Sequence, residues 1–161
     1  MTGLRITAVD EKTIEITGIA PVLSHCIFQL PEILRRRESP GIRDRFYQAA
    51  QPEDAKVSAE WREISTPELH HLYASAEETV LRDLTGLAED TVRFPAVHLP
   101  AWLTALNQAR LVLGELHRVT EADMERIDLD PGAAAKDGAL LQIHLLGVLL
   151  QLLVDHAQAT G

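Results

Sequence analysis

The sequence has only one cysteine, Cys26, among its 161 residues. One thiol excludes an intrachain disulfide and a zinc site built from cysteines. Aromatic residues are also scarce, at 4%, whereas apolar residues make up 46% and charged residues 24%, as in ordinary globular proteins. This composition excludes intrinsic disorder, collagen and a coiled-coil fibre, and the length predicts one domain over residues 1–161.

Positively charged residues are fewer than negatively charged ones. Lysine and arginine number 15 against 24 aspartates and glutamates, which leaves a formal net charge of −9. Such a surface repels phosphate at long range, so a broad nucleic-acid interface is disfavoured. The first residues lack the apolar core of an export signal. The missing export signal and the single cysteine favour a cytoplasmic protein. The negative net charge argues against a nucleic-acid partner.

The sequence also has no charge-free apolar run as long as the roughly 20 residues of a membrane-spanning helix. The longest run, Gly138–Val154, contains eight leucines and is interrupted by glutamine and histidine. At 100° per residue, His144, Gln151 and Asp155 share one narrow arc, while the other faces are apolar. We therefore expect a central helix wrapped by other helices, with these three residues as a polar seam, and no membrane span.

The start of the chain changes from strand to helix periodicity. Residues 4–17 alternate between apolar and polar on either side of a short turn, which predicts a β-hairpin. From Pro21 the apolar residues recur at helical steps, and Cys26 lies on their stripe. Pro31 should kink or divide this helix, because proline lacks a backbone donor and crowds the preceding turn.

Helical periodicity dominates the rest of the chain. A short helix is expected over Glu53–Glu63 and a separate one from Pro67 to Gly86, with Leu72 on its buried stripe. Thr91–Phe94 is predicted to be a strand that joins the hairpin. Further helices should open at Pro100, at the capping box that begins with Thr120, and near Asp130 or Asp137. The expected fold is mainly α: a compact helical bundle over residues 21–157 around the C-terminal apolar helix, with the β-hairpin before it.

Sequence motifs for nucleotide and nucleophile chemistry are missing. The chain has no glycine-rich phosphate loop, no dinucleotide fingerprint and no Gly-x-Ser-x-Gly elbow. Asp128 and Asp130 are spaced like the start of a calcium loop, but Pro131 favours a helix cap instead. Glu68 and His71 have the spacing of half a di-iron site without its other half, so we interpret them as a solvated helix face. No catalytic, cofactor-binding or metal-binding residue is predicted.

Three features keep a structural and a functional interpretation open. The seam of His144, Gln151 and Asp155 is either a polar stripe against a neighbouring helix or a site for proton transfer or a ligand. Cys26 is either a buried small apolar residue, which its stripe favours, or a reactive thiol. We expect Arg110, at the edge of an apolar stripe, to pair with a carboxylate inside the fold, and the alternative is an arginine that binds a partner or a phosphate.

The stretch from Trp102 to Gly114, W-L-T-A-L-N-Q-A-R-L-V-L-G, resembles the signature of the bacterial, mainly actinobacterial, domain-of-unknown-function family DUF2017. Members typically have W-L-x-x-L-N-D-x-R-L-x-L-G there. Residues 30–34, 45–54 and 60–69 fit the family as well. Gln108 stands where the family usually has aspartate, so this chain lacks any pairing of that acid with Arg110. The matching residues, which we expect to be structural, are Trp102, Leu106, Asn107, Arg110, Leu113 and Gly114.

The resemblance implies little about function. Genes of the family often lie beside that of the adaptor of the Clp protease, and some members are described as transcriptional regulators tied to oxidative stress. We therefore expect a non-enzymatic cytoplasmic regulatory or adaptor protein that acts through protein–protein contacts. Its partner is either a protein linked to the Clp system or a second copy of the chain. The alternatives are a DNA-associated regulator of a stress response, and a small-ligand binder or enzyme that uses the seam on the last helix.

Overall fold

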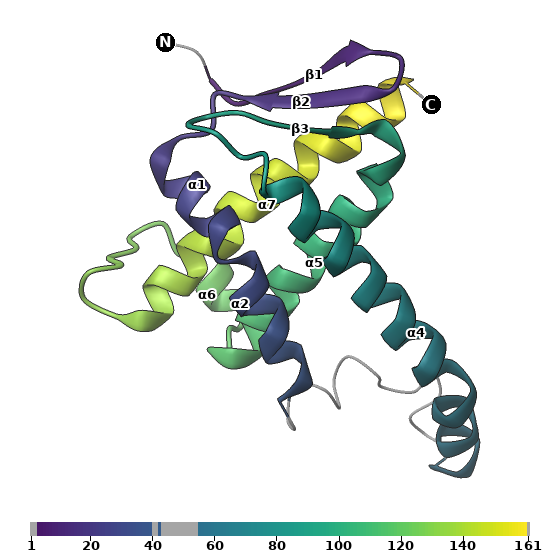
Figure 1. The fold of residues 1–161 in the computed structure, drawn as a ribbon. Helices are drawn as coiled ribbons and strands as arrows, with labels where there is room; N and C mark the ends of the chain where they lie inside the picture. Colours follow the sequence, from purple (N-terminus) through teal and green to yellow (C-terminus); the bar gives the residue numbers. More distant parts are fainter. Residues whose placement is uncertain (1–2, 40–41, 43–54, 161) are drawn as a thin grey trace.

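The computed structural model describes residues 3–39, 42 and 55–160, without the side chains of residues 55–66. In chain order its elements are β1 (Arg5–Asp10), β2 (Thr13–Thr17), α1 (Pro21–Phe28), α2 (Leu30–Arg35), the 3₁₀ turn η1 (Arg36–Glu38), α4 (Ala55–Leu84), β3 (Val92–Pro95), the 3₁₀ turn η2 (Ala96–His98), α5 (Leu99–Leu116), α6 (Glu121–Met124) and α7 (Ala135–Thr160). Figure 1 shows the strands lying across one end of the helices, with β1 beside the C-terminal part of α7. The predicted fold class, a mainly helical bundle with a small N-terminal β element, is confirmed.

The predicted β-hairpin is present as strands β1 and β2, which pair antiparallel. In the turn between them, the backbone N–H of Lys12 donates to Asp10 Oδ1 at 2.8 Å. Strand β3 pairs with the other edge of β2, so the strand expected near residue 92 does join the hairpin. One face of the sheet is buried on the helices, and its side chains are those of Ile14, Ile16, Val92 and Phe94.

A break at Gln29 divides the first predicted helix into α1 and α2. Pro31 lies in the first turn of α2, where its missing N–H costs no helical hydrogen bond. Cys26 lies on the inner side of α1 and is only 3% exposed. Burial raises the pKa of the Cys26 thiol, while a hydrogen bond with Gln142 acts in the opposite direction. Both observations agree with the interpretation of Cys26 as a buried apolar residue.

We expect the thiol of Cys26 to react slowly with a thiol reagent in the native protein. Its thiolate is disfavoured by burial, and the reagent cannot reach it until α1 opens. Cys26→Ala should cost roughly 1 kcal/mol of stability, because a small buried group is removed. Labelling with a chromogenic disulfide, native and in denaturant, measures this. Stoichiometric labelling of the native protein at the denatured rate would contradict the buried position.

Helix α4 differs in two ways from what its sequence predicts. The two helices predicted on either side of residue 66 form one helix, Ala55–Leu84, with Pro67 in its interior. An interior proline costs about 3 kcal/mol, and the part of α4 after it is held by burial of Ala76 and Val80 against the rest of the bundle. Leu72 was expected to be buried but is 53% exposed. The contact face of α4 is therefore narrower than its apolar stripe.

Helices α5 and α7 form the centre of the bundle. Helix α7 also contacts α1 and β1, so the expected bundle around the C-terminal helix is present. The other elements do not cover α7 on all sides, because Val148 on the face opposite the contacts is 53% exposed. With 26 residues, α7 is longer than the apolar run suggested, and its length and composition would also suit a membrane-spanning helix. The core side chains that α7 contributes are Leu140, Ile143, Leu146, Leu149 and Leu153.

Candidate functional site

Half of the signature stretch on α5 lies in the core. Trp102 is fully buried, stacks on Phe94 with 4.8 Å between ring centroids, and donates from Nε1 to Asp83 Oδ2 at 2.8 Å. Leu106 and Leu113 are buried on the same face of the helix. The expectation that these residues are structural agrees with their burial.

The other half of the stretch faces a hollow. Asn107, Arg110, Leu111 and Gly114 are three or four residues apart and therefore share one face of α5. They line a hollow of about 300 Å³. A volume of this size is at the lower end of the range for small-molecule sites. The remaining lining residues are Glu115, Val119, Met124 and, from α7, Ile143.

Arg110 is half-buried at this hollow, and its Nε donates to the backbone carbonyl of Ile143 at 3.1 Å. Within the part of the chain that the structure describes, no carboxylate pairs with Arg110, so the expected ion pair is not found there. Gly147 on α7 explains the position of the Arg110 side chain, because glycine leaves room for the guanidinium. A Cβ at Gly147 would lie 3.2 Å from the guanidinium carbon of Arg110. The guanidinium therefore lies directly against α7 and uses a main-chain acceptor.

The two terminal nitrogens of Arg110 make no hydrogen bond with the residues that the structure describes. They are not among the buried polar atoms that lack a partner, so they keep some exposure to solvent, although Nη2 lies against α7 beside Gly147. Asn107, one turn earlier on the same face, is exposed. The hollow thus presents the two terminal nitrogens of Arg110 beside aliphatic side chains, with Glu115 as an acidic group in its lining. These two nitrogens are called the arginine fork below.

Gly114 shows no steric reason for being glycine. A Cβ there would meet no atom within 4 Å, and its backbone is helical. Glycine inside a helix costs roughly 1 kcal/mol relative to alanine. Because Gly114 lines the hollow, the missing side chain leaves the space beside Arg110 open.

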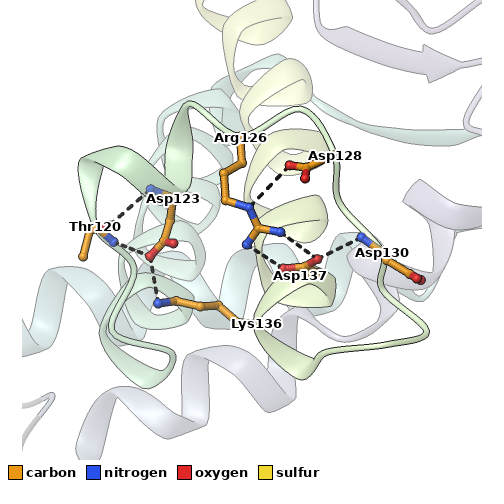
Figure 2. Close-up of polar contacts among 7 residues, drawn as sticks. All are labelled: Thr120, Asp123, Arg126, Asp128, Asp130, Lys136 and Asp137. Atoms are coloured by element: carbon orange, nitrogen blue, oxygen red, sulfur yellow. Dashed lines mark hydrogen bonds and ion pairs between the residues drawn. The ribbon is translucent and has the colours of Figure 1, made fainter.

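One wall of the hollow comes from the segment around α6, which contributes Val119 and Met124. This segment is fixed by the predicted capping box: Thr120 Oγ1 accepts from Asp123 N at 3.1 Å, and Asp123 Oδ2 accepts from Thr120 N at 3.0 Å. Lys136, in the first turn of α7, pairs with Asp123 at 2.8 Å (Figure 2).

The loop between α6 and α7 is fixed by a second cluster. Arg126 donates from both terminal nitrogens to the carboxylate of Asp137, at 2.9 and 3.0 Å, and the Asp130 N–H donates to the same carboxylate at 2.9 Å (Figure 2). Asp137 is 6% exposed. The Asp130 N–H and the Arg126 guanidinium lower the pKa of Asp137, and Asp137 in turn raises the pKa of Arg126. This cluster, with the Thr120–Asp123–Lys136 contacts, is called the α6–α7 clamp below.

We expect the α6–α7 clamp to weaken as the pH falls from about 4 to 2. The Lys136 ammonium and the Thr120 N–H lower the pKa of Asp123 to about 2, below the roughly 3.9 of an unfolded aspartate. A lowered folded pKa gives stability that is present above the unfolded pKa and lost as the pH falls through the folded one. The stability difference between the parent and Asp123→Asn, from urea unfolding, should therefore be largest above pH 5. It should shrink towards pH 2, and a difference independent of pH would contradict this assignment.

Gln108, which stands at the position of the family's aspartate, is paired with a different arginine. It is 3% exposed and accepts from Arg37 Nη1 at 2.6 Å. Arg37 is itself 3% exposed, donates from Nη2 to Glu77 at 3.2 Å and lies over the ring of Tyr73 at 5.6 Å. A residue at position 108 therefore faces Arg37 rather than Arg110. The burial of Arg37 is not predictable from the sequence, because an arginine next to two others near a helix end is typical of a solvated surface.

The polar seam lies on the outside of α7. Gln151 Nε2 donates to Asp155 Oδ1 at 2.9 Å, and both residues are exposed. His144 is half-buried and forms no hydrogen bond or ion pair with the other residues that the structure describes. The seam does not run against a neighbouring helix, since the contact face of α7 is its opposite side. It borders the turn of α7 that carries Gly147 and the Arg110 hollow.

Other polar candidates are held by simple structural contacts. Asp83, which accepts from Trp102, also contacts His98 Nδ1 at 3.0 Å, and no sequence pattern indicated this pair. Glu68 and His71 are exposed, as a solvated helix face requires. Over the described residues, no group of three histidine, cysteine or acidic side chains is close enough to hold a metal ion. The Arg110 hollow is thus the candidate site with the most specific chemistry.

The fold places the chain among mainly helical proteins that carry a small antiparallel sheet. The model of the family described as domain of unknown function (DUF2017) matches residues 12–157, which is most of the chain. The chain belongs to this family. Neither a search of curated proteins nor a search of solved structures found a match. The signature stretch and the Arg110 hollow both lie within the matched residues.

Proposed function

We propose that the chain is a non-enzymatic binding protein of the adaptor type, which holds a partner protein through a carboxylate seated on Arg110. The observation that carries this proposal is the free arginine fork in the hollow on α5. One nitrogen of the guanidinium is fixed on Ile143, and the other two have no described partner. The guanidinium is therefore oriented before any partner arrives.

A carboxylate is the group that best fits this fork. Two parallel N–H donors match the two oxygens of a carboxylate, and such charge-assisted hydrogen bonds are about twice as strong as neutral ones. Aliphatic side chains of Leu111, Val119 and Met124 line the hollow, and a bound carboxylate would lie beside them. The net charge of −9 disfavours ligands of higher negative charge, such as a nucleic acid. This supports an acidic side chain or a chain terminus over a nucleic-acid backbone.

A protein partner is favoured over a small molecule by the surroundings of the hollow. Leu111, next to Arg110 in the lining of the hollow, is 52% exposed. An arginine beside an exposed apolar side chain is typical of the centre of a protein–protein interface. The hollow alone is small enough for an organic acid, so a small-ligand binder is the alternative that the test below separates.

Site-specific photocrosslinking in the host cell tests the proposal. A photoreactive residue at Leu111 should crosslink to one distinct protein, and Arg110→Gln should remove that product, because glutamine has the polarity but not the charged fork. The same residue at Leu72, which is equally exposed on α4, is the matched control and should not give the product.

The crosslink between Leu111 and the partner protein should depend on Arg110. Crosslinks at Leu111 that persist in Arg110→Gln would contradict the role of the fork. A further measurement is calorimetric titration of the purified chain with acetate and succinate. Tight binding of a free acid to the parent but not to Arg110→Gln, without a protein crosslink, would assign the hollow to a small ligand instead.

A further inference from the structure

The outer face of α7 carries a second feature, which is independent of the Arg110 hollow. Val148 on this face is 53% exposed, and the leucines in line with it are half-buried. The residues follow one another at alternating steps of three and four, the spacing of the a and d positions of a coiled coil. They are called the outer stripe below and consist of Gly138, Leu141, Leu145, Val148, Leu152 and Asp155.

We propose that the outer stripe pairs with the outer stripe of a second copy of the chain, with the two α7 helices antiparallel. The order of its residues is self-complementary about a point between residues 146 and 147. Leu145 then faces Val148 of the partner subunit, and Leu141 faces Leu152 of the partner subunit. Every a position meets a d position, as side-chain interdigitation between antiparallel helices requires, and a two-fold axis relates the copies.

The lack of charge along residues 138–154 favours an uncharged contact, such as the same surface of a second copy, over a charged partner. The chain carries a net charge of −9, so two copies repel each other over most of their surface. Residues 138–154 contain no aspartate, glutamate, lysine or arginine. Between Gly138 and Leu152, the outer stripe is therefore a surface on which two copies can approach without bringing like charges together.

The ends of the outer stripe favour the antiparallel arrangement over the parallel one. In a parallel pair, Asp155 of each copy would face the other across the axis, and two like charges would meet. In the antiparallel pair, Asp155 of the partner subunit faces Gly138, where a Cβ would meet no atom within 4 Å. It also lies near the N-terminal end of α7, where the helix dipole favours a negative charge.

A second helix also fits the width of the outer stripe. The buried side of α7 is occupied by α5, α1 and β1, and the polar seam borders the stripe and shares Asp155 with it. The exposed apolar surface is therefore confined to the line of side chains between them. A line of this width is typical of the contact between two helices, whereas a lipid-facing helix is apolar over a broad arc.

Light scattering of the purified chain after size-exclusion chromatography measures the oligomeric state. The parent should have twice the monomer mass of 17.8 kDa. Val148→Glu should convert it to a monomer, because it places a charge at the centre of each stripe. Leu72→Glu, at an equally exposed leucine on α4, should remain a dimer. A monomeric parent, or a Val148→Glu dimer, would overturn the proposal.

Cysteine crosslinking tests the direction of the helices, in a Cys26→Ala background. An equimolar mixture of Leu141→Cys and Leu152→Cys chains should form a disulfide-linked dimer, because these positions face each other. Each variant alone should not, since 11 residues separate the two positions along the helix, or about 16 Å, and a disulfide needs Cα atoms within about 7 Å. Disulfide formation by one variant alone would overturn the antiparallel arrangement. A monomeric chain that sediments with phosphatidylcholine vesicles would assign the stripe to a membrane instead.

Discussion

Trp102→Ala should lower the free energy of unfolding by about 3–5 kcal/mol, the range for removal of a large buried aromatic side chain. Trp102 is fully buried and stacks on Phe94, so its loss leaves a cavity between α5 and the sheet. It also removes the Nε1 donor from Asp83. Because the total stability of a domain is about 5–15 kcal/mol, urea unfolding should show a large shift of the midpoint.

Two further variants separate packing from hydrogen bonding at this position. Trp102→Phe keeps a ring against Phe94 but leaves Asp83 without the indole donor, and should cost roughly 1–3 kcal/mol. Leu111→Ala, on the exposed side of the same helix, should change stability by about 0.5 kcal/mol or less. A Trp102→Ala variant as stable as Leu111→Ala would contradict the burial of the indole.

Local periodicity explains why much of the fold is predictable from the sequence. Alternation in residues 4–17 predicts the hairpin, and the stripe that begins at Trp102 correctly gives the buried face of α5. Both patterns depend only on neighbours along one element. Pro67 shows the limit of such patterns, because contacts made elsewhere by α4 hold a helix that a proline would otherwise interrupt.

The candidate site depends on contacts between elements, which local patterns do not contain. The position of Arg110 at the edge of an apolar stripe is visible in the sequence, but its acceptor is not. The acceptor is a main-chain carbonyl of α7, reachable because Gly147 is close by in the folded chain. The same limit applies to Gln108. In the sequence it stands out only as a departure from the family motif. The fold buries its amide, a buried amide needs a partner, and that partner is Arg37.

The unexpected burial of Arg37 leads to the second large effect. Arg37→Ala should cost about 3–5 kcal/mol, because it leaves Gln108 buried without its donor and removes the cation opposite Glu77. Arg35→Ala is the matched control two residues earlier. Its side chain is 73% exposed and pairs only with exposed Glu32, so the loss should be about 0.5 kcal/mol or less.

A double-mutant cycle identifies the arginine that is coupled to position 108. Gln108→Leu removes the unsatisfied amide that Arg37→Met would leave, so the double variant should recover part of the loss, with a coupling of roughly 0.5–3 kcal/mol. In the matching cycle, Arg110→Gln and Gln108→Leu should be additive, because Arg110 is fixed on Ile143 and shares no partner with Gln108. Coupling to Arg110 and additivity with Arg37 would reverse this assignment, and would make Arg110 part of the core rather than the free fork of a binding site.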